Sequence, residues 1–193
     1  MDTQILNKLN SFTKKRLYEI AGIVLIASNL FLIASIFTYS PTDPNFIYTP
    51  ENTEIKNIGG FYGSVISDFF LQSIGLITLL LIMTLLSWSY KLLIKQSINN
   101  LPLKTFFIIV YIIFGTLFTN ILFNNSYLLV DNGNGGFVGN IIKEKIYNLF
   151  PFIENQYVSY LLILLTLIFF TLSLDLKINQ INKILISPII FLK

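Results

Sequence analysis

Four long stretches without any Asp, Glu, Lys or Arg constrain this sequence more than any other feature. The stretches are residues 20–42, 69–90, 105–130 and 155–174, and they contain 23, 22, 26 and 20 residues. About 20 mainly apolar residues in a helix are enough to cross the bilayer core, which is roughly 30 Å thick. The sequence therefore predicts an all-α membrane protein with four transmembrane helices, near 19–39, 69–90, 105–124 and 157–175.

The composition argues against soluble and catalytic classes of protein. Charged residues make up 12% of the chain, about half of the roughly 25% that is usual in soluble domains. The chain contains no His and no Cys, so the commonest general base, the commonest metal ligands and any disulfide are excluded. We therefore expect no catalytic residue, no metal site and no cofactor in this chain, and a membrane-embedded enzyme has no catalytic constellation to support it.

The Lys and Arg residues outside the spans predict the orientation. Short loops rich in Lys and Arg stay in the cytoplasm. Three of the thirteen basic residues lie in the loops after the first and third spans, and ten lie at the two ends and in the loop 91–104. We therefore expect a cytoplasmic segment 1–16, a membrane domain 17–176 and a cytoplasmic juxtamembrane tail 177–193. The basic excess fits this pattern and the lipid bilayer as a partner, so no DNA-binding patch is expected.

Amphipathic segments flank the spans. Apolar residues recur at near-helical spacing within 1–16 and within 176–186, which predicts short helices on the inner membrane face. The same spacing between Val138 and Phe150, ended by Pro151, predicts an amphipathic helix in the second outer loop, lying in the outer interface.

Glycines cluster in both outer loops. The run 131–139 has no preceding strand and no following Gly-Lys-Ser/Thr, and it lacks calcium ligands at the third, fifth and twelfth positions, so we interpret it as a flexible turn. Gly59, Gly60 and Gly63 in the first loop fit either tight turns or a small face that allows close helix packing. The turn interpretation is favoured for Gly59 and Gly60.

One face of the first span carries small residues. Ala21, Ser28 and Ser35 recur every seven residues. Because small residues allow close helix contacts in lipid, we expect this face to meet another helix of the bundle or a second copy in a homo-oligomer. Asn29, near the middle of the span, is expected to form a hydrogen bond across that contact.

Asp68 is the acidic residue nearest to the interior of a span, and two interpretations apply to it. It is either a proton or partner contact, or a carboxylate in the first turn of the second span that interacts favourably with the helix dipole. We favour the dipole interpretation.

The order of turn residues in the outer loops resembles a known family. Ser40-Pro41, Asp43-Pro44, Asn57-x-Gly59, Gly63-Ser64, Asp68 and Gly75 resemble the segment between the first two helices of the N-terminal four-helix domain of FtsK/SpoIIIE-type DNA translocases. Gly135-Gly136-x-Val138-Gly139 resembles the second outer loop of that family. Together with the four spans, the resemblance covers roughly residues 15 to 176.

The resemblance implies a bacterial inner-membrane protein of the division septum. In that family the membrane domain anchors and oligomerises an ATP-driven motor that acts in cell division and chromosome partition, and it contacts other division proteins. The resemblance implies roles in loop shape and partner contact, rather than in catalysis, for nine residues: Asp43, Pro44, Asn57, Gly59, Gly63, Asp68, Gly135, Gly136 and Gly139.

The chain departs from the family because it contains no Gly-x-x-x-x-Gly-Lys-Ser/Thr sequence, so we expect ATP, Mg and DNA to bind only in a motor domain that this chain lacks. It is then either a fragment or a shortened gene product. The alternative function is a small transporter or channel subunit unrelated to division. A transporter is expected to show polar residues at mid-membrane, broken helices or internal repeats. The sequence shows no convincing repeat and no Pro inside a span, and Asn29 has too little polar company for a substrate site.

Overall fold

The structure is a computed structural model that describes residues 3–49, 54–95, 97–123, 129 and 131–174. Within these ranges every regular element is a helix, so the predicted all-α fold is confirmed. Four helical segments are long and apolar enough to cross a membrane: Asn10–Phe37, Gly60–Ile94, Leu101–Leu122 and Gln156–Ser173. The elements in chain order are α1 (Thr3–Phe37), α2 (Gly60–Ile74), the 3-10 turn η1 (Gly75–Ile77), α3 (Thr78–Lys95), α4 (Leu101–Leu122), α5 (Gly136–Leu149), the 3-10 turn η2 (Pro151–Glu154) and α6 (Gln156–Ser173).

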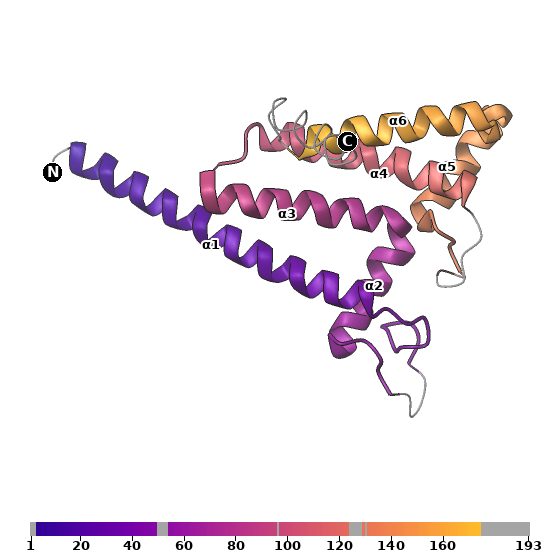
Figure 1. Ribbon diagram of the computed structural model, residues 1–193, viewed down its shortest axis with the longest axis horizontal. Helices are drawn as coiled ribbons and strands as arrows, with labels where there is room; N and C mark the ends of the chain where they lie inside the picture. Colours follow the sequence, from indigo (N-terminus) through magenta and orange to yellow (C-terminus); the bar gives the residue numbers. More distant parts are fainter. Residues whose placement is uncertain (1–2, 50–53, 96, 124–128, 130, 175–193) are drawn as a thin grey trace, which may run out of the picture.

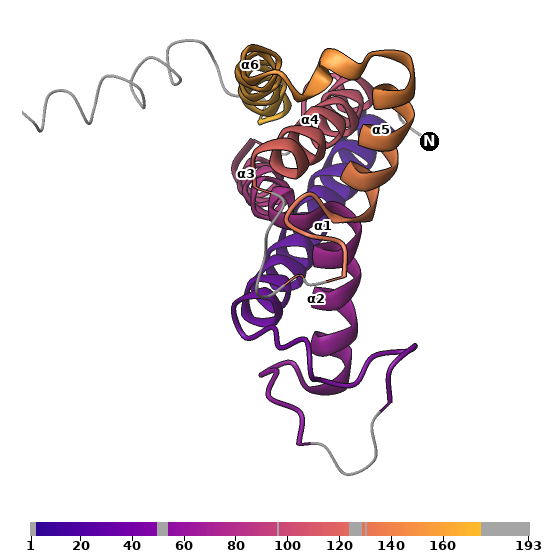
Figure 2. The same ribbon diagram turned by 90° about the vertical axis from the view of Figure 1, so that its right-hand side faces the viewer.

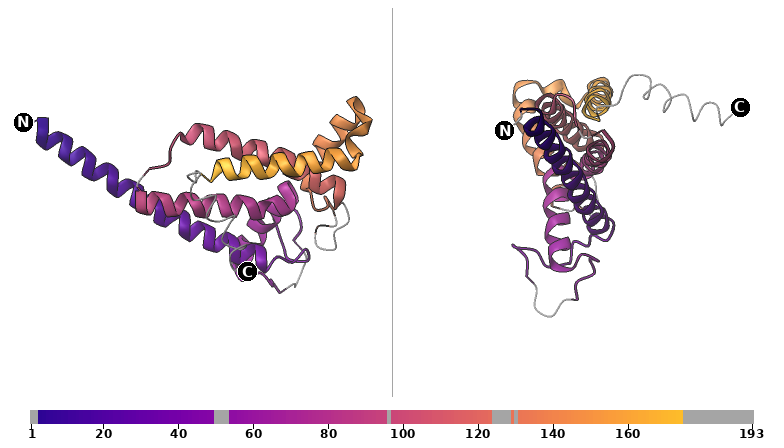
Figure 3. Two further views of the ribbon diagram at one scale, coloured as in Figure 1. Left: turned by 45° about the horizontal axis from the view of Figure 1, so that its top comes forward. Right: turned by 90° about the vertical axis from the view of Figure 1, so that its left-hand side faces the viewer.

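Two pairs of helices form the bundle (Figures 1 and 3). α4 packs along α6, and α1 packs along α3. The pairs meet where Ile77, Ile108 and Tyr111 form a buried cluster. The Tyr111 hydroxyl lies 3.2 Å from the Thr84 hydroxyl, and the Tyr111 ring meets Phe170 edge-on with centroids 5.8 Å apart. Side chains from α3, α4 and α6 therefore share one core.

α2 and α5 lie at one end of the bundle. Figure 2 shows α2 running across this end, while α3, α4 and α6 are seen nearly along their axes. α5 packs against both α4 and α2. We call this the outer end and the opposite one the inner end, following the predicted orientation.

A break at Gly75 divides the second hydrophobic segment. The backbone of Gly75 has a φ of 58°, and the 3-10 turn η1 separates α2 from α3. A positive φ takes the chain out of the right-handed helical region, so α3 departs in a different direction from α2 (Figure 1). The expectation of one uninterrupted helix over 69–90 is therefore wrong.

α1 is one continuous helix from Thr3 to Phe37. The expectation of a separate surface helix within 1–16 is wrong, because no Gly or Pro interrupts residues 3–21. An ion pair of 2.5 Å between Arg16 and Glu19, three residues apart, spans the expected junction and is typical of a continuing helix. The helix expected over 176–186 and the tail 177–193 lie outside the described residues.

Candidate functional site

The first outer loop is closed by a buried carboxylate. Asp43 is only 3% exposed, and its two oxygens accept hydrogen bonds from the backbone amides of Lys56, at 3.1 Å, and Asn57, at 2.8 Å. Hydrogen bonds to a charged acceptor are stronger than neutral ones. Asp43 therefore fixes the segment that enters this loop to the segment that leaves it.

Asn57 joins the same loop to two helices. Its side-chain NH2 group donates to the Ser35 carbonyl of α1 at 2.8 Å and to the Ser67 hydroxyl of α2 at 3.3 Å. Its Oδ1 atom accepts from the Gly59 amide at 2.9 Å. Both donors and the acceptor of this buried amide are therefore used, which suits a loop held in one conformation.

Gly59 and Gly63 allow α1 and α2 to cross closely. A Cβ atom on either glycine would lie 3.0 Å from the Ser35 hydroxyl. Nearby, the Ser64 hydroxyl donates to the Pro44 carbonyl at 2.7 Å. Close packing therefore applies to Gly59 and Gly63. The favoured turn interpretation is confirmed as well, because Gly59 lies in the turn before α2 and Gly60 has a φ of 62°.

Asp68 lies in the middle of α2 and binds two residues from outside that helix. Its carboxylate accepts from the Tyr39 hydroxyl at 3.2 Å and from the Asn45 side-chain amide at 2.9 Å. The dipole interpretation is wrong because α2 begins at Gly60, about two turns before Asp68. Burial raises the pKa of Tyr39 to about 12, so its hydroxyl remains a protonated donor at neutral pH.

The hydrogen bonds continue from Asp68 to the second outer loop. Gln72 donates to the Tyr39 hydroxyl at 3.3 Å and accepts from the Asn132 side chain at 2.9 Å. The Asn140 side chain of α5 donates to the Asn132 carbonyl at 3.0 Å and accepts from the Asn120 side chain of α4. We call this chain of contacts, from Asn45 through Asp68 to Asn120, the outer network. It links both outer loops to α2, α4 and α5.

The glycine-rich run 131–139 begins with the predicted turn, over residues 131–135, but its glycines pack closely against other parts of the chain. Gly135 and Gly139 are buried against α4, where a Cβ atom on either would lie 2.5 Å from the Thr116 carbonyl. A Cβ atom on Gly136 would lie 2.7 Å from the Gly75 amide nitrogen. Side chains at these positions would separate the run from α4 and from the helix break, which explains the small residues there.

The residues of the predicted small face of α1 differ in their exposure. Ser35 and Asn29 are buried, whereas Ala21 and Ser28 are exposed. Asn29 donates to the Leu25 carbonyl of its own helix at 2.9 Å, and its Oδ1 atom is buried without a partner. Among the described residues, the expected hydrogen bond from Asn29 to another helix is therefore not formed, because its amide group reaches the carbonyl one turn earlier.

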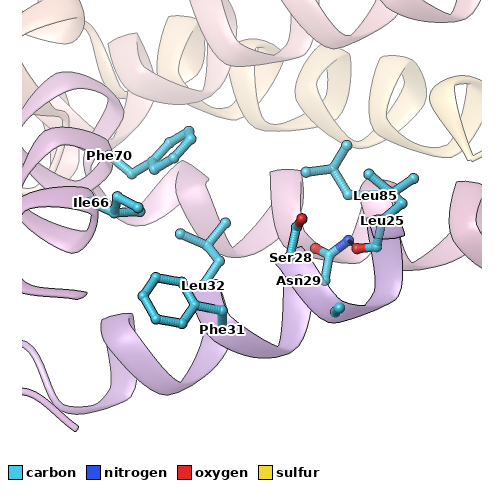
Figure 4. A pocket seen from close by; sticks show the side chains of 9 residues that line it. Leu25, Ser28, Asn29, Phe31, Leu32, Ile66, Phe70 and Leu85 are labelled. Carbon is cyan, nitrogen blue, oxygen red and sulfur yellow. Dashed lines mark hydrogen bonds between the residues drawn. The ribbon is translucent and has the colours of Figure 1, made fainter. Parts of the chain in front are cut away.

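A groove opens beside this face of α1 (Figure 4). Its volume is about 510 Å³, and Ile66 and Phe70 of α2 and Leu85 of α3 form its far side. Its residues from α1 are Leu25, Ala27, Ser28, Asn29, Phe31 and Leu32. Ser28 therefore faces a cavity that the described residues of its own chain do not fill.

Sequence reasoning missed several members of the outer network, namely Tyr39, Asn45, Gln72, Asn132 and Asn140. One signal is available in the sequence, because Asn120 is a polar residue inside an apolar stretch. In the described part of the chain, no group of three His, Cys, Asp or Glu residues could hold a metal ion.

Comparison with known proteins gives one consistent result. The family model described as the 4TM region of DNA translocase FtsK/SpoIIIE matches residues 14–183. A DNA translocase FtsK from Mesorhizobium japonicum is 22% identical over 136 residues, which are 70% of this chain and 15% of that protein. One from Rhizobium meliloti is 31% identical over 85 residues, covering 44% of this chain and 10% of its own length.

A third relative, DNA translocase FtsK from Vibrio parahaemolyticus, is 36% identical over 69 residues, covering 36% of this chain and 6% of that protein. This chain therefore spans only a small part of the length of these relatives. No solved structure matches. The family model covers most of the sequence, and the chain belongs to the family of the four-helix membrane region of FtsK/SpoIIIE DNA translocases.

Proposed function

We propose that this region anchors a DNA translocase in the bacterial inner membrane, directs it to the division septum and brings several copies together. The four apolar helical segments and the family match support the anchoring role. In this proposal, ATP hydrolysis and DNA movement belong to parts of the translocase that correspond to the unmatched length of the relatives.

The outer network is the observation that best supports septal targeting. The buried residues of the two loops have the proposed role of shaping them: Asp43, Asn57, Gly63, Gly135, Gly136 and Gly139. Contact with division-septum membrane proteins then belongs to the exposed side chains on the same loop and on α2. Phe46, Ile47, Tyr62 and Phe69 are 76%, 97%, 72% and 64% exposed, and clusters of exposed apolar side chains are typical of interaction sites.

The groove beside α1 supports self-association. Ala21 and Ser28 leave small residues on an exposed helix face, where the backbone of another helix could approach closely. We assign this position to a helix from a second copy of the chain. Ser35 is already used in the contact with α2, so the oligomer contact is restricted to the part of α1 that includes Ala21 and Ser28.

The alternative of a transporter subunit has one feature in its favour, since a helix is broken within a hydrophobic segment. In transporters, broken helices expose backbone groups to a substrate site. Here the Leu76 amide donates to the Asn134 carbonyl at 3.0 Å. Because the Leu76 amide is bonded inside the protein, it is not exposed to a substrate, and the break between α2 and α3 is better explained as part of the packed structure than as a transport site.

Photo-crosslinking in the source bacterium tests the targeting proposal. A photoreactive amino acid at Tyr62, on the outer face of α2, is expected to form adducts with division proteins. The matched control is Leu161 of α6, which is 54% exposed on a helix that spans the bundle. Adducts at Leu161 as abundant as those at Tyr62, or none with division proteins at Tyr62, would contradict the proposal.

A further inference from the structure

Side chains of two neighbouring helices hold the inner end of α6. The last carbonyl groups of a helix have no partner within the helix and need donors from elsewhere. Lys104 of α4 donates from Nζ to the Leu172 carbonyl at 2.6 Å. Trp88 of α3 donates from Nε1 to the Ser173 carbonyl at 2.9 Å. Three consecutive carbonyls are held in this way, because the Ser87 hydroxyl of α3 donates to the Leu174 carbonyl at 2.9 Å.

The side chain of Ser173 is held as well. Its hydroxyl lies 3.3 Å from the Thr84 hydroxyl of α3, which in turn lies 3.2 Å from the Tyr111 hydroxyl of α4. Thr84, Tyr111 and Ser173 are all fully buried.

The positive charge of Lys104 also lies at the negative end of the α6 dipole, which is the favourable arrangement. We call Ser87, Trp88 and Lys104 the α6 clamp.

The α6 clamp lies at the end of α6 from which the chain continues, so it affects how α6 responds to a pulling force. Leu174 is the point from which the sequence continues toward residue 193. A pull on that continuation would unwind an unsupported helix from its end, one backbone hydrogen bond at a time. Contacts from α3 and α4 to the last carbonyls must break before α6 can unwind, so the load passes to three helices instead of one.

We propose that the α6 clamp is a mechanical anchor that transmits tension from the chain after residue 174 to α3 and α4. This inference rests on the proposed function and adds the premise that the DNA-translocating part continues from residue 174 and pulls against the membrane region. Ser87, Trp88 and Lys104 are then positioning residues that keep the point of exit fixed while force is applied.

Single-molecule force spectroscopy on the 193-residue chain in a lipid bilayer tests the proposal. Pulling on a C-terminal tag extracts α6 first, and pulling on an N-terminal tag extracts α1 first. We expect Lys104→Met and Trp88→Phe each to raise the rate of α6 extraction at constant force about three- to tenfold, as loss of one hydrogen bond predicts. The rate of α1 extraction should not change.

Two further variants separate a mechanical role from general stability. Lys104→Arg keeps a charged donor for the Leu172 carbonyl and should restore the wild-type rate. Thr171→Val removes a hydroxyl that bonds only to the Ile168 carbonyl within α6, and it should leave the rate unchanged. If Lys104→Met or Trp88→Phe unfolds the chain, Ser87→Ala removes one clamp contact with little change in side-chain volume.

Two results would overturn the proposal: α6 extraction at the wild-type rate in Lys104→Met, Trp88→Phe and Ser87→Ala, or equal acceleration of extraction from both ends. Septal localisation of the chain is measured separately. Wild-type extraction rates in the clamp variants, together with septal localisation of the natural chain, reject this inference alone. Accelerated α6 extraction in the clamp variants, together with no crosslinking of the natural chain to division proteins, rejects the proposed function alone.

Discussion

Gly75 and Gly136 pack backbone against backbone at the outer end of the bundle. A Cβ atom on Gly75 would lie 2.9 Å from the Gly136 nitrogen, and a Cβ atom on Gly136 would lie 2.7 Å from the Gly75 nitrogen. Both residues have positive φ angles, 58° and 65°. The break between α2 and α3 is therefore filled by the second outer loop, and each glycine depends on the other.

Alanine at either glycine is expected to destabilise the chain strongly. Gly75→Ala and Gly136→Ala each combine a strained backbone with a steric clash, for a loss of about 2–4 kcal/mol in the free energy of unfolding. Gly60→Ala is the matched control, because Gly60 has a φ of 62° but no atom within 4 Å of the added Cβ. It should cost only the backbone strain, about 1–2 kcal/mol. Denaturation in detergent micelles measures all three, and equal losses would contradict the packing argument.

Removing the Asp43 carboxylate is expected to open the first outer loop. Asp43→Ala leaves the Lys56 and Asn57 amides without their acceptor, and an unsatisfied buried donor costs about 1–3 kcal/mol. Amide hydrogen exchange at Lys56 and Asn57 should therefore accelerate. Asp131→Asn changes an exposed acid of the other loop and should leave that exchange unchanged. Unaltered exchange in Asp43→Ala would show that other contacts close the loop.

A cysteine at Ser28 is expected to form disulfide-linked dimers in membranes. The natural chain contains no cysteine, so a single introduced thiol reports one position without background. Ser28→Cys should crosslink on oxidation, and adding Ala21→Leu should reduce the yield several-fold because a bulky side chain separates the helices. Cysteine at exposed Leu164 of α6 is the control. Equal crosslinking from Leu164 would indicate random collision instead of an α1 contact.

Replacing Asn29 with leucine is expected to leave stability unchanged or to raise it by up to about 1 kcal/mol. The Oδ1 atom is buried without a partner, so an apolar side chain of similar shape removes an unsatisfied group. Thermal unfolding in micelles measures the effect. A loss of more than about 1 kcal/mol would show that Asn29 has a partner in the folded protein, which a second copy would have to supply.

The hydrophobic helices could be predicted from the sequence, because charge-free length is a local property that does not depend on packing. The break at Gly75 could not be predicted in this way. A single glycine in an apolar stretch is compatible with a continuous helix, and its φ depends on Asn134 and Gly136, about 60 residues later. The continuity of α1 could have been inferred from the lack of Gly and Pro between residues 3 and 21.

The candidate site shows the same division between local and tertiary information. The resemblance selected Asp43, Asn57 and the paired glycines by their order along the chain, and the structure places most of them in two packed clusters. Tyr39 and Gln72 could not be selected, because their hydrogen bonds join residues 29 or more apart in the sequence. Asp68 was misassigned because the second span was predicted to begin near residue 69, about nine residues after the observed start of α2 at Gly60.

Septal localisation tests the central claim, that the joined outer loops form the targeting surface, most directly. The 193-residue chain with a fluorescent protein at its C-terminus is imaged in dividing cells of the source bacterium, and the fraction of membrane fluorescence at the septum is compared among variants of equal abundance. We predict septal enrichment for the natural chain and for Gly60→Ala, and an even membrane distribution for Gly136→Ala and for the double variant Tyr62→Ala/Phe69→Ala. Even distribution of the natural chain, or full enrichment of both disrupted variants, would contradict the claim.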